Sequence, residues 1–144
     1  MNKSLKNRMW NYQVVSTKYD EVTGISEVII NPHTGGSFIG RAKCHPEEAY
    51  KSKFFGCEMA EFRAILSYLK VILVEKKAVL DALVHLSSSF RPNSKMRKAI
   101  AAAEKDVQDV KEEIERLTKG LSKKAELREE MAKKINKKYI KEFL

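Results

Sequence analysis

The residues best suited to bind a ligand lie in the stretch SSSFRPNSK, which joins two segments with helical periodicity. Phe90 offers a ring on which a base can stack, and Arg91 offers a planar cation that can form two hydrogen bonds to a phosphate. Asn93 can recognise a polar edge of a ligand, or it can cap the helix that follows, a role for which Ser94 is the other candidate. Burial of Phe90 beneath the loop is the structural alternative to stacking. Together with the rigid Pro92, these side chains predict a preformed site for an anionic nucleotide.

A second candidate for phosphate binding is the glycine-rich stretch HTGGSFIGRA, which contains Arg41. Glycines let a backbone approach a phosphate closely, and Arg41 could pair with it. The favoured alternative is a hairpin turn followed by a strand in which Gly40 is closely packed. The basic segment from Lys123 to Lys141 could follow a nucleic-acid backbone, but its interspersed glutamates are typical of a solvated helix.

Common catalytic and metal-binding patterns are missing from the sequence. It has no nucleophile elbow, no Walker loop and no His-Glu-x-x-His pair, so we expect no enzyme and no catalytic residue. His33 is expected in a turn, and His85 is expected near the end of a helix, where a cation suits the dipole. Cys44, His45 and Cys57 could ligate zinc together with His33, but their spacing matches no common zinc pattern. We therefore expect no metal and no cofactor.

The chain is basic throughout, with a net charge of +9. Residues 1–92 carry 13 basic and 9 acidic side chains and residues 94–144 carry 15 and 10, so both parts are positive, by 4 and 5. Such a surface favours an anionic partner, although a lysine-rich solvated surface is an alternative explanation. The N-terminus lacks the apolar stretch of a signal peptide, and the longest aliphatic run, Val71–Val74, is far too short to span a bilayer. We expect a soluble intracellular protein with reduced thiols and no membrane partner.

Residues 10–45 carry the signals of a small antiparallel sheet. Trp10, Tyr12 and Val14 occupy alternate positions, which predicts a first strand. The turn DEVTG, the β-branched run ISEVIIN, the turn NPHTGG and the run SFIGRAKC predict two more strands joined by short turns.

We predict a first helical segment over residues 46–88, a loop over residues 89–94 and a second helical segment over residues 95–143. In both helices apolar residues recur at alternating spacings of three and four. This spacing slips near Gly120, where we expect the second helix to kink or end. The fold class is therefore α+β, with a small three-stranded antiparallel sheet followed by a long antiparallel hairpin of two helices, in a single domain of residues 1–144. The apolar rows of the first helix are Met59, Phe62, Leu66, Leu69, Leu73, Leu80 and Leu83, interrupted by Lys76, and Ile65, Ile72, Val79 and Leu86.

Helices of about 30 residues span about 45 Å, which a three-stranded sheet cannot cover. The apolar surface near Leu80, Leu83 and Leu86 would then need another chain. We therefore predict a homo-oligomer, with a two-fold antiparallel dimer as its basic form.

A family resemblance lies in the run MWNYQVVSTKYDEVTGISEVIINPHTGGSFIGRAKCHPEEA and the two long helices behind it. In these features the chain resembles the phage Thoeris anti-defence sponge family. The resemblance implies a protein of the host bacterial cytoplasm that binds cyclic ADP-ribose-type immune signals, such as glycocyclic ADP-ribose, and sequesters them without cleaving them. It also implies dimers or hexamers built from dimers, and cyclic oligonucleotides at separate sites of hexameric members.

The pocket of that family lies at the dimer interface and uses an aromatic residue, an asparagine and arginines. By this resemblance, Phe90 and Asn93 are the candidates for the first two, and Arg91, Arg63 and Arg116 are candidates for the arginines. Arg63 lies 27 residues from Phe90, about 40 Å along a helix, so the two can share a pocket only between subunits. The sequence therefore predicts a composite site for a cyclic nucleotide signal. The alternative is a basic oligomeric nucleic-acid-binding or phage structural protein, although nucleic acid is not the partner we expect.

Overall fold

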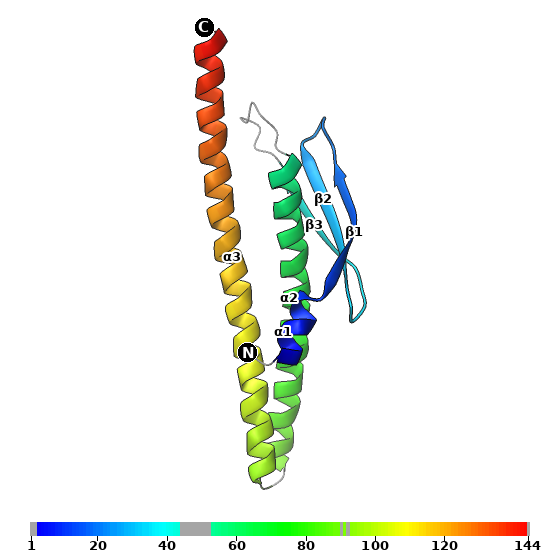
Figure 1. The fold of residues 1–144 in the computed structure, drawn as a ribbon. Coiled ribbons are helices and arrows are strands. Elements are labelled where there is room, and N and C mark those ends of the chain that lie inside the picture. Colours follow the sequence, from blue (N-terminus) through cyan, green and yellow to red (C-terminus); the bar gives the residue numbers. More distant parts are fainter. Residues whose placement is uncertain (1–2, 44–52, 90, 92, 144) are drawn as a thin grey trace.

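A computed structural model describes residues 3–43, 53–89, 91 and 93–143 of the chain. The predicted α+β fold, a three-stranded antiparallel sheet followed by two long helices, is confirmed (Figure 1). No helix among the described residues combines the length and the apolar character needed to cross a membrane. The elements are α1 (Lys3–Trp10), β1 (Tyr12–Tyr19), β2 (Ile25–Pro32), β3 (Phe38–Lys43), α2 (Lys53–Ser89) and α3 (Ser94–Phe143).

The sheet has the order β1-β2-β3, and its two faces have different environments. On β2, Ser26, Val28 and Ile30 are buried, whereas the alternate residues Glu27 and Ile29 are partly exposed. This follows from the two-residue period of a strand, which sends successive side chains to opposite faces. One face of the sheet therefore packs on α2, and the other remains open.

The inner face of the sheet lies very close to α2 because glycine occupies β3 at the point of contact. A Cβ atom added at Gly40 would lie 1.8 Å from the carbonyl oxygen of Ala60 and 2.6 Å from the amide nitrogen of Ala64. The predicted close packing of Gly40 is confirmed. Gly56 plays a similar part on α2, since a Cβ atom there would lie 2.3 Å from Oγ of Ser26.

Helices α2 and α3 form an antiparallel hairpin with a register set by ion pairs. Near its middle, Lys76 Nζ of α2 lies 3.7 Å from Asp106 Oδ2 of α3. A second ion pair joins Glu58, 18 residues before Lys76, to Lys124, 18 residues after Asp106. Lys76, the polar interruption of the predicted apolar row, therefore faces α3 through this ion pair. The buried residues between and beneath the helices include Ile65, Leu69, Ile72, Val107, Val110 and Leu117.

The N-terminal helix α1 differs from the sequence-based prediction, which placed Trp10 on a strand. Leu5 and Met9 are buried at the side of the hairpin, and Trp10 is the last residue of α1. Arg8 Nη2 donates to Glu75 Oε2 at 2.5 Å, and Tyr68 Oη donates to the carbonyl oxygen of Arg8 at 3.2 Å. The helical conformation is therefore stabilised by contacts with α2, which a local pattern does not reveal.

The second helix does not end at Gly120, in contrast to the expectation of a kink or an end there. Helix α3 continues through this position to Phe143, and a Cβ atom at Gly120 would meet nothing within 4 Å. Beyond the sheet the apolar rows of α2 become exposed, with Val79 at 53% and Leu86 at 45%. The helix start predicted at residues 46–52 lies outside the described residues.

Candidate functional site

The loop between α2 and α3 carries two of the predicted ligand-binding residues that the structure describes. Arg91 and Asn93 are both exposed. Asn93 Oδ1 accepts a hydrogen bond from the amide of Met96 at 2.8 Å, and the Asn93 carbonyl oxygen accepts one from Arg97 at 3.1 Å. Asn93 is therefore the N-cap of α3, the role that the sequence offered as the alternative to ligand recognition. Phe90 and Pro92 lie outside the described residues.

Two of the predicted arginines meet where the sheet packs on α2. Arg63 Nη1 donates to the carbonyl oxygen of Arg41 at 2.6 Å, which joins α2 to β3. Arg41 Nε in turn donates to Glu27 Oε2 at 2.8 Å across neighbouring strands. Arg63 therefore contacts the backbone of Arg41, whose own side chain pairs with Glu27 and remains 66% exposed.

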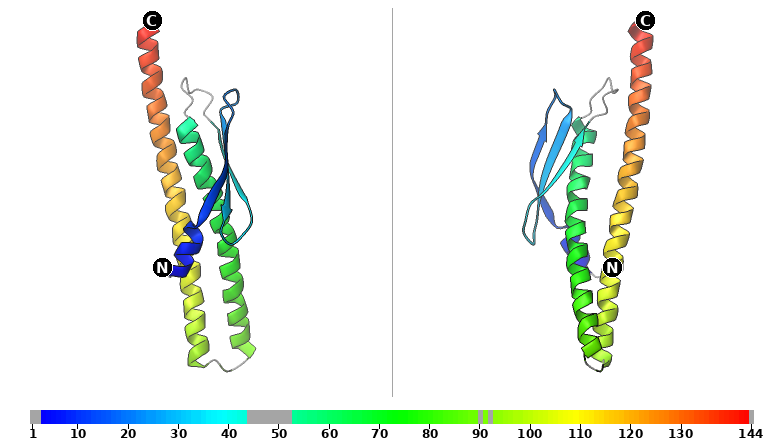
Figure 2. Two further views of the ribbon diagram at one scale, coloured as in Figure 1. Left: turned by 45° about the vertical axis from the view of Figure 1, so that its right-hand side comes forward. Right: turned by 180° about the vertical axis from the view of Figure 1, so that it is seen from behind.

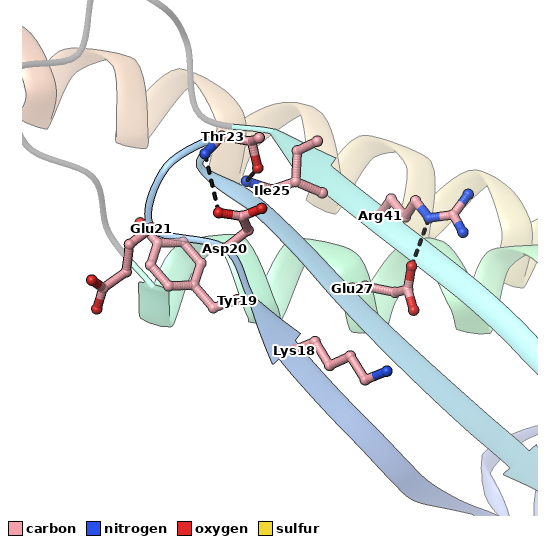
Figure 3. Close-up of a pocket in the computed structure, with 8 residues that line it drawn as sticks. All are labelled: Lys18, Tyr19, Asp20, Glu21, Thr23, Ile25, Glu27 and Arg41. Carbon is pink, nitrogen blue, oxygen red and sulfur yellow. Dashed lines mark hydrogen bonds and ion pairs between the residues drawn. The ribbon is translucent and has the colours of Figure 1, made fainter.

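An open hollow of about 1090 Å³ lies at the end of the sheet beside Arg41 (Figure 3). The strand register places Lys18 and Arg41 on either side of Glu27. Asp20 lies at the β1–β2 turn, where its carboxylate accepts hydrogen bonds from the amides of Val22 and Thr23. The lining contains more acidic than basic side chains, which makes this hollow a poor site for an anion. It is lined by Lys18, Tyr19, Asp20, Glu21, Thr23, Ile25, Glu27 and Arg41.

Arg116 is held by contacts with α1 and with its own helix. Its Nη2 atom forms an ion pair with Glu113, and its guanidinium carbon lies 5.6 Å from the centre of the Trp10 ring. The hydrogen bond to Glu113 raises the pKa of Arg116, and burial opposes this only in part, so the group stays cationic. The sequence did not reveal the contact between Trp10 and Arg116, because the two residues lie 106 positions apart in the chain.

The predicted site residues fall into two groups at opposite ends of the hairpin. By the register of the ion pairs, Arg116 lies across from residues near Leu66 on α2, close to the level of Arg63. Arg91 and Asn93 lie at the loop, and the stretch of α2 from Arg63 to Ser89 covers about 39 Å. Figure 1 shows this separation, with the sheet beside one end of α2 and the loop at the other. A single protomer therefore does not bring all the candidate residues into one pocket.

The histidine and cysteine residues form no metal centre where they can be described. The amide of His33 donates to the carbonyl oxygen of Asn11 at 3.0 Å, His85 is exposed, and Cys57 is a free thiol. No group of three His, Cys, Asp or Glu side chains suited to a metal ion occurs within the described ranges. Cys44 and His45 lie outside them.

Comparison with known proteins adds no relative from which a role could be transferred. A scan against protein-family models, a search of curated proteins and a search of solved structures each returned no match. The resemblance to the Thoeris anti-defence sponges therefore rests on the sequence features described above and remains a prediction.

Proposed function

We propose that this protein is a non-catalytic phage anti-defence sponge that binds and sequesters a cyclic ADP-ribose-type signal in the host cytoplasm. The observation that carries the proposal is the position of the exposed loop residue Arg91, about 40 Å along the hairpin from Arg63. In an antiparallel dimer, the loop of one protomer would approach the Arg63 region of the other. Two composite sites would result, each with cations for the pyrophosphate.

The roles in such a site follow from the chemistry of each side chain. Phe90, a candidate taken from the sequence, would stack on adenine, while Arg91 and Arg63 would pair with phosphate oxygens. Arg41 and Arg116 are secondary candidates, because Glu27 and Glu113 already neutralise them within the protomer. Sequestration is stoichiometric, so the protein must bind the signal more tightly than the signal's effector does. A preformed site helps, because fewer side chains lose conformational freedom when the ligand binds.

The rival proposal is a basic protein that binds nucleic acid or forms part of a phage structure. The lysines of α3 are less suited to bind a nucleic-acid backbone than the net charge suggests, because Lys119 pairs with Glu115 and Lys133 Nζ lies 3.9 Å from Glu129 Oε1. These ion pairs interrupt the positive charge along the helix. Hexamers and a separate site for cyclic oligonucleotides remain part of the resemblance-based proposal.

The deciding experiment follows the fate of the ligand. The protein is incubated with cyclic ADP-ribose isomers, free ligand is removed, and the heated protein is assayed for released ligand. We expect intact ligand in stoichiometric amount from the wild type, and none from Phe90→Ala or Arg91→Gln. Lys111→Gln removes an exposed charge from α3 and serves as the matched control.

Two outcomes would overturn the proposal. Recovery of a cleaved product would indicate an enzyme. An undepleted ligand together with salt-dependent binding to duplex DNA would favour the nucleic-acid-binding alternative.

A further inference from the structure

The side of the sheet that faces away from α2 is uncovered. Helix α2 packs on the other side, and the view from behind in Figure 2 shows α2 between the sheet and α3. The strand register identifies the uncovered side, because paired residues of neighbouring strands lie on the same face. We call this side the open face. Its residues are Gln13, Ser16 and Lys18 of β1, Ile25, Glu27, Ile29 and Asn31 of β2, and Ile39, Arg41 and Lys43 of β3.

An apolar row crosses the middle of the open face. Ile29 of β2 pairs with Ile39 of β3, and the side chain of Ile39 is 48% exposed. At the edge of the same row, Val15 is 49% exposed in the bulge of β1. An antiparallel sheet can leave one face to water, but that face is then normally polar. Exposed isoleucine and valine on an uncovered face are instead typical of a docking surface.

Cations flank this apolar row on both edge strands of the sheet. Lys18 of β1 and Arg41 of β3 lie on either side of Glu27 (Figure 3), and Lys43 follows on β3. Glu27 pairs with Arg41, whereas Lys18 and Lys43 are exposed and have no ion-pair partner within the described part of the chain. The further carboxylates that line the hollow, at residues 20–21, lie in the turn beyond the end of β1. Charge complementarity therefore favours an acidic partner for the open face.

The aromatic residues of the strands do not lie on the open face. Tyr12 donates a hydrogen bond to Glu61 of α2, and the ring of Phe38 lies 5.2 Å from a tyrosine ring of α2. Tyr19 is paired with a buried serine of β2. A sheet that binds single-stranded nucleic acid uses aromatic rings on which the bases stack. The open face, with cations and aliphatic side chains but no ring, therefore suits a protein better than a nucleic acid.

The width of the open face matches one helix. Neighbouring strands lie about 4.8 Å apart, so the two edge strands are separated by about 10 Å, which is close to the diameter of a helix with its side chains. The inner face of the same sheet already packs on a single helix, α2. A helix lying along β2 on the open face would cover Ile29 and Ile39. Its two flanks would lie beside Lys18 on one edge strand and Lys43 on the other.

We infer that the open face docks an amphipathic helix of a partner protein, with aliphatic residues over Ile29 and Ile39 and acidic residues beside Lys18 and Lys43. The inference goes beyond the proposed function, because the docked helix would use neither the loop between α2 and α3 nor Arg63. A protein bound here would be held at a surface separate from those residues.

Selection from a displayed library of random helical peptides tests the location and the chemistry of this surface. Peptides that bind the wild type are depleted on the variant Ile39→Glu, and the remaining peptides are sequenced. We expect them to carry glutamate or aspartate on both flanks of an aliphatic row. A synthesised peptide of this kind should bind less tightly as the salt concentration rises, because salt screens exposed charges.

Charge reversal tests the orientation of the peptide on the face. Ile39→Glu and the double variant K18E/K43E should each bind the selected peptide at least about tenfold more weakly than the wild type, since both place carboxylates against acidic side chains. A peptide whose acidic residues are replaced by lysine should lose binding to the wild type and bind K18E/K43E. Lys111→Glu changes an exposed lysine of α3 and should bind as the wild type does. Circular dichroism checks the fold, and K18E/K43E provides the test if Ile39→Glu does not fold.

Several results would overturn the inference. These are a selection that yields no peptide sensitive to Ile39→Glu, selected peptides that are neutral or basic, and a charge swap that does not restore binding. Binding of single-stranded DNA that Ile39→Glu abolishes would assign the face to nucleic acid, and a change of oligomeric state in Ile39→Glu would assign it to a second copy of this chain. Retention of cyclic ADP-ribose should be unchanged in Ile39→Glu, so the proposed function and this inference can fail separately.

Discussion

The guanidinium carbon of Arg116 lies 5.6 Å from the centre of the Trp10 ring and joins the N-terminal helix to α3. On its other side, Arg116 pairs with Glu113, a residue only 8% exposed. The cation thus compensates a buried carboxylate while the ring covers part of its surface. A residue proposed from the sequence as a ligand-binding arginine has a structural role within the protomer.

Replacing Arg116 with Met tests this role, because Met keeps the aliphatic stem and removes the cation. We expect the free energy of unfolding to fall by about 1–2 kcal/mol, since Glu113 loses its partner and the cation–π contact is lost. The emission spectrum of Trp10, the single tryptophan of the chain, should change as well. Adding Glu113→Gln should recover part of the stability. An unchanged spectrum would show that the Trp10–Arg116 contact does not form in solution.

Gly40 and Gly120 provide a matched pair of substitutions to alanine. Gly40→Ala should lower the free energy of unfolding by about 3 kcal/mol or more, because its Cβ atom would overlap the backbone of Ala60 and Ala64. Gly120→Ala has open space within α3 and should raise stability by up to about 1 kcal/mol. Thermal or denaturant unfolding measures both changes. Wild-type stability of Gly40→Ala would exclude the close contact between β3 and α2.

Tyr12 is partly buried, and its Oη atom donates a hydrogen bond of 3.0 Å to Glu61 Oε1, so the stability of the fold should decrease at alkaline pH. Burial, followed by the hydrogen bond and the charge of Glu61, raises the pKa of Tyr12 from 10.0 to about 12. The folded state therefore favours the neutral phenol. Its contribution is fully present below pH 10 and is lost as the pH rises from about 10 to about 12.

This contribution is on the order of 1 kcal/mol once solvent screening of the partly exposed pair is considered. Denaturant unfolding across this window should show a smaller loss of stability in Tyr12→Phe than in the wild type. Glu61→Gln should lower the pKa of Tyr12 only in part, because burial is the largest cause of the shift. Equal losses in wild type and Tyr12→Phe would contradict the assignment.

Asn93 caps α3, and substitutions can separate this role from ligand recognition. Asn93→Ala should cost about 1 kcal/mol of stability, because the amide of Met96 loses its acceptor. Asn93→Asp keeps an acceptor and should preserve stability, since a carboxylate suits the N-terminus of a helix. In the proposed site, however, the added negative charge should reduce retention of an anionic ligand. A variant Asn93→Asp that retains ligand fully would limit Asn93 to capping.

Much of the fold follows from local patterns. The β-branched run around Val28 and Ile30 and the glycine-containing turns predict strands, and the three-four spacing predicts both helices. The capping of α3 by Asn93 was also accessible from the sequence, because a cap involves residues only three apart. Gly120 was misleading, since a propensity cost of about 1 kcal/mol is small against the packing of a 50-residue helix.

The sequence by itself determined the strands, the turns and the two long helices, because each depends on residues that are close together in the chain. It also supplied the loop residues that we propose as a nucleotide site. Only the tertiary structure decided that Trp10 ends a helix and lies against Arg116, and that Arg63 meets the backbone of Arg41. These relationships join residues far apart in the chain or depend on which faces their neighbours cover. Packing decides these relationships. The burial of apolar surface brings distant segments together, and because this force is non-directional, the local sequence does not show which segments will meet.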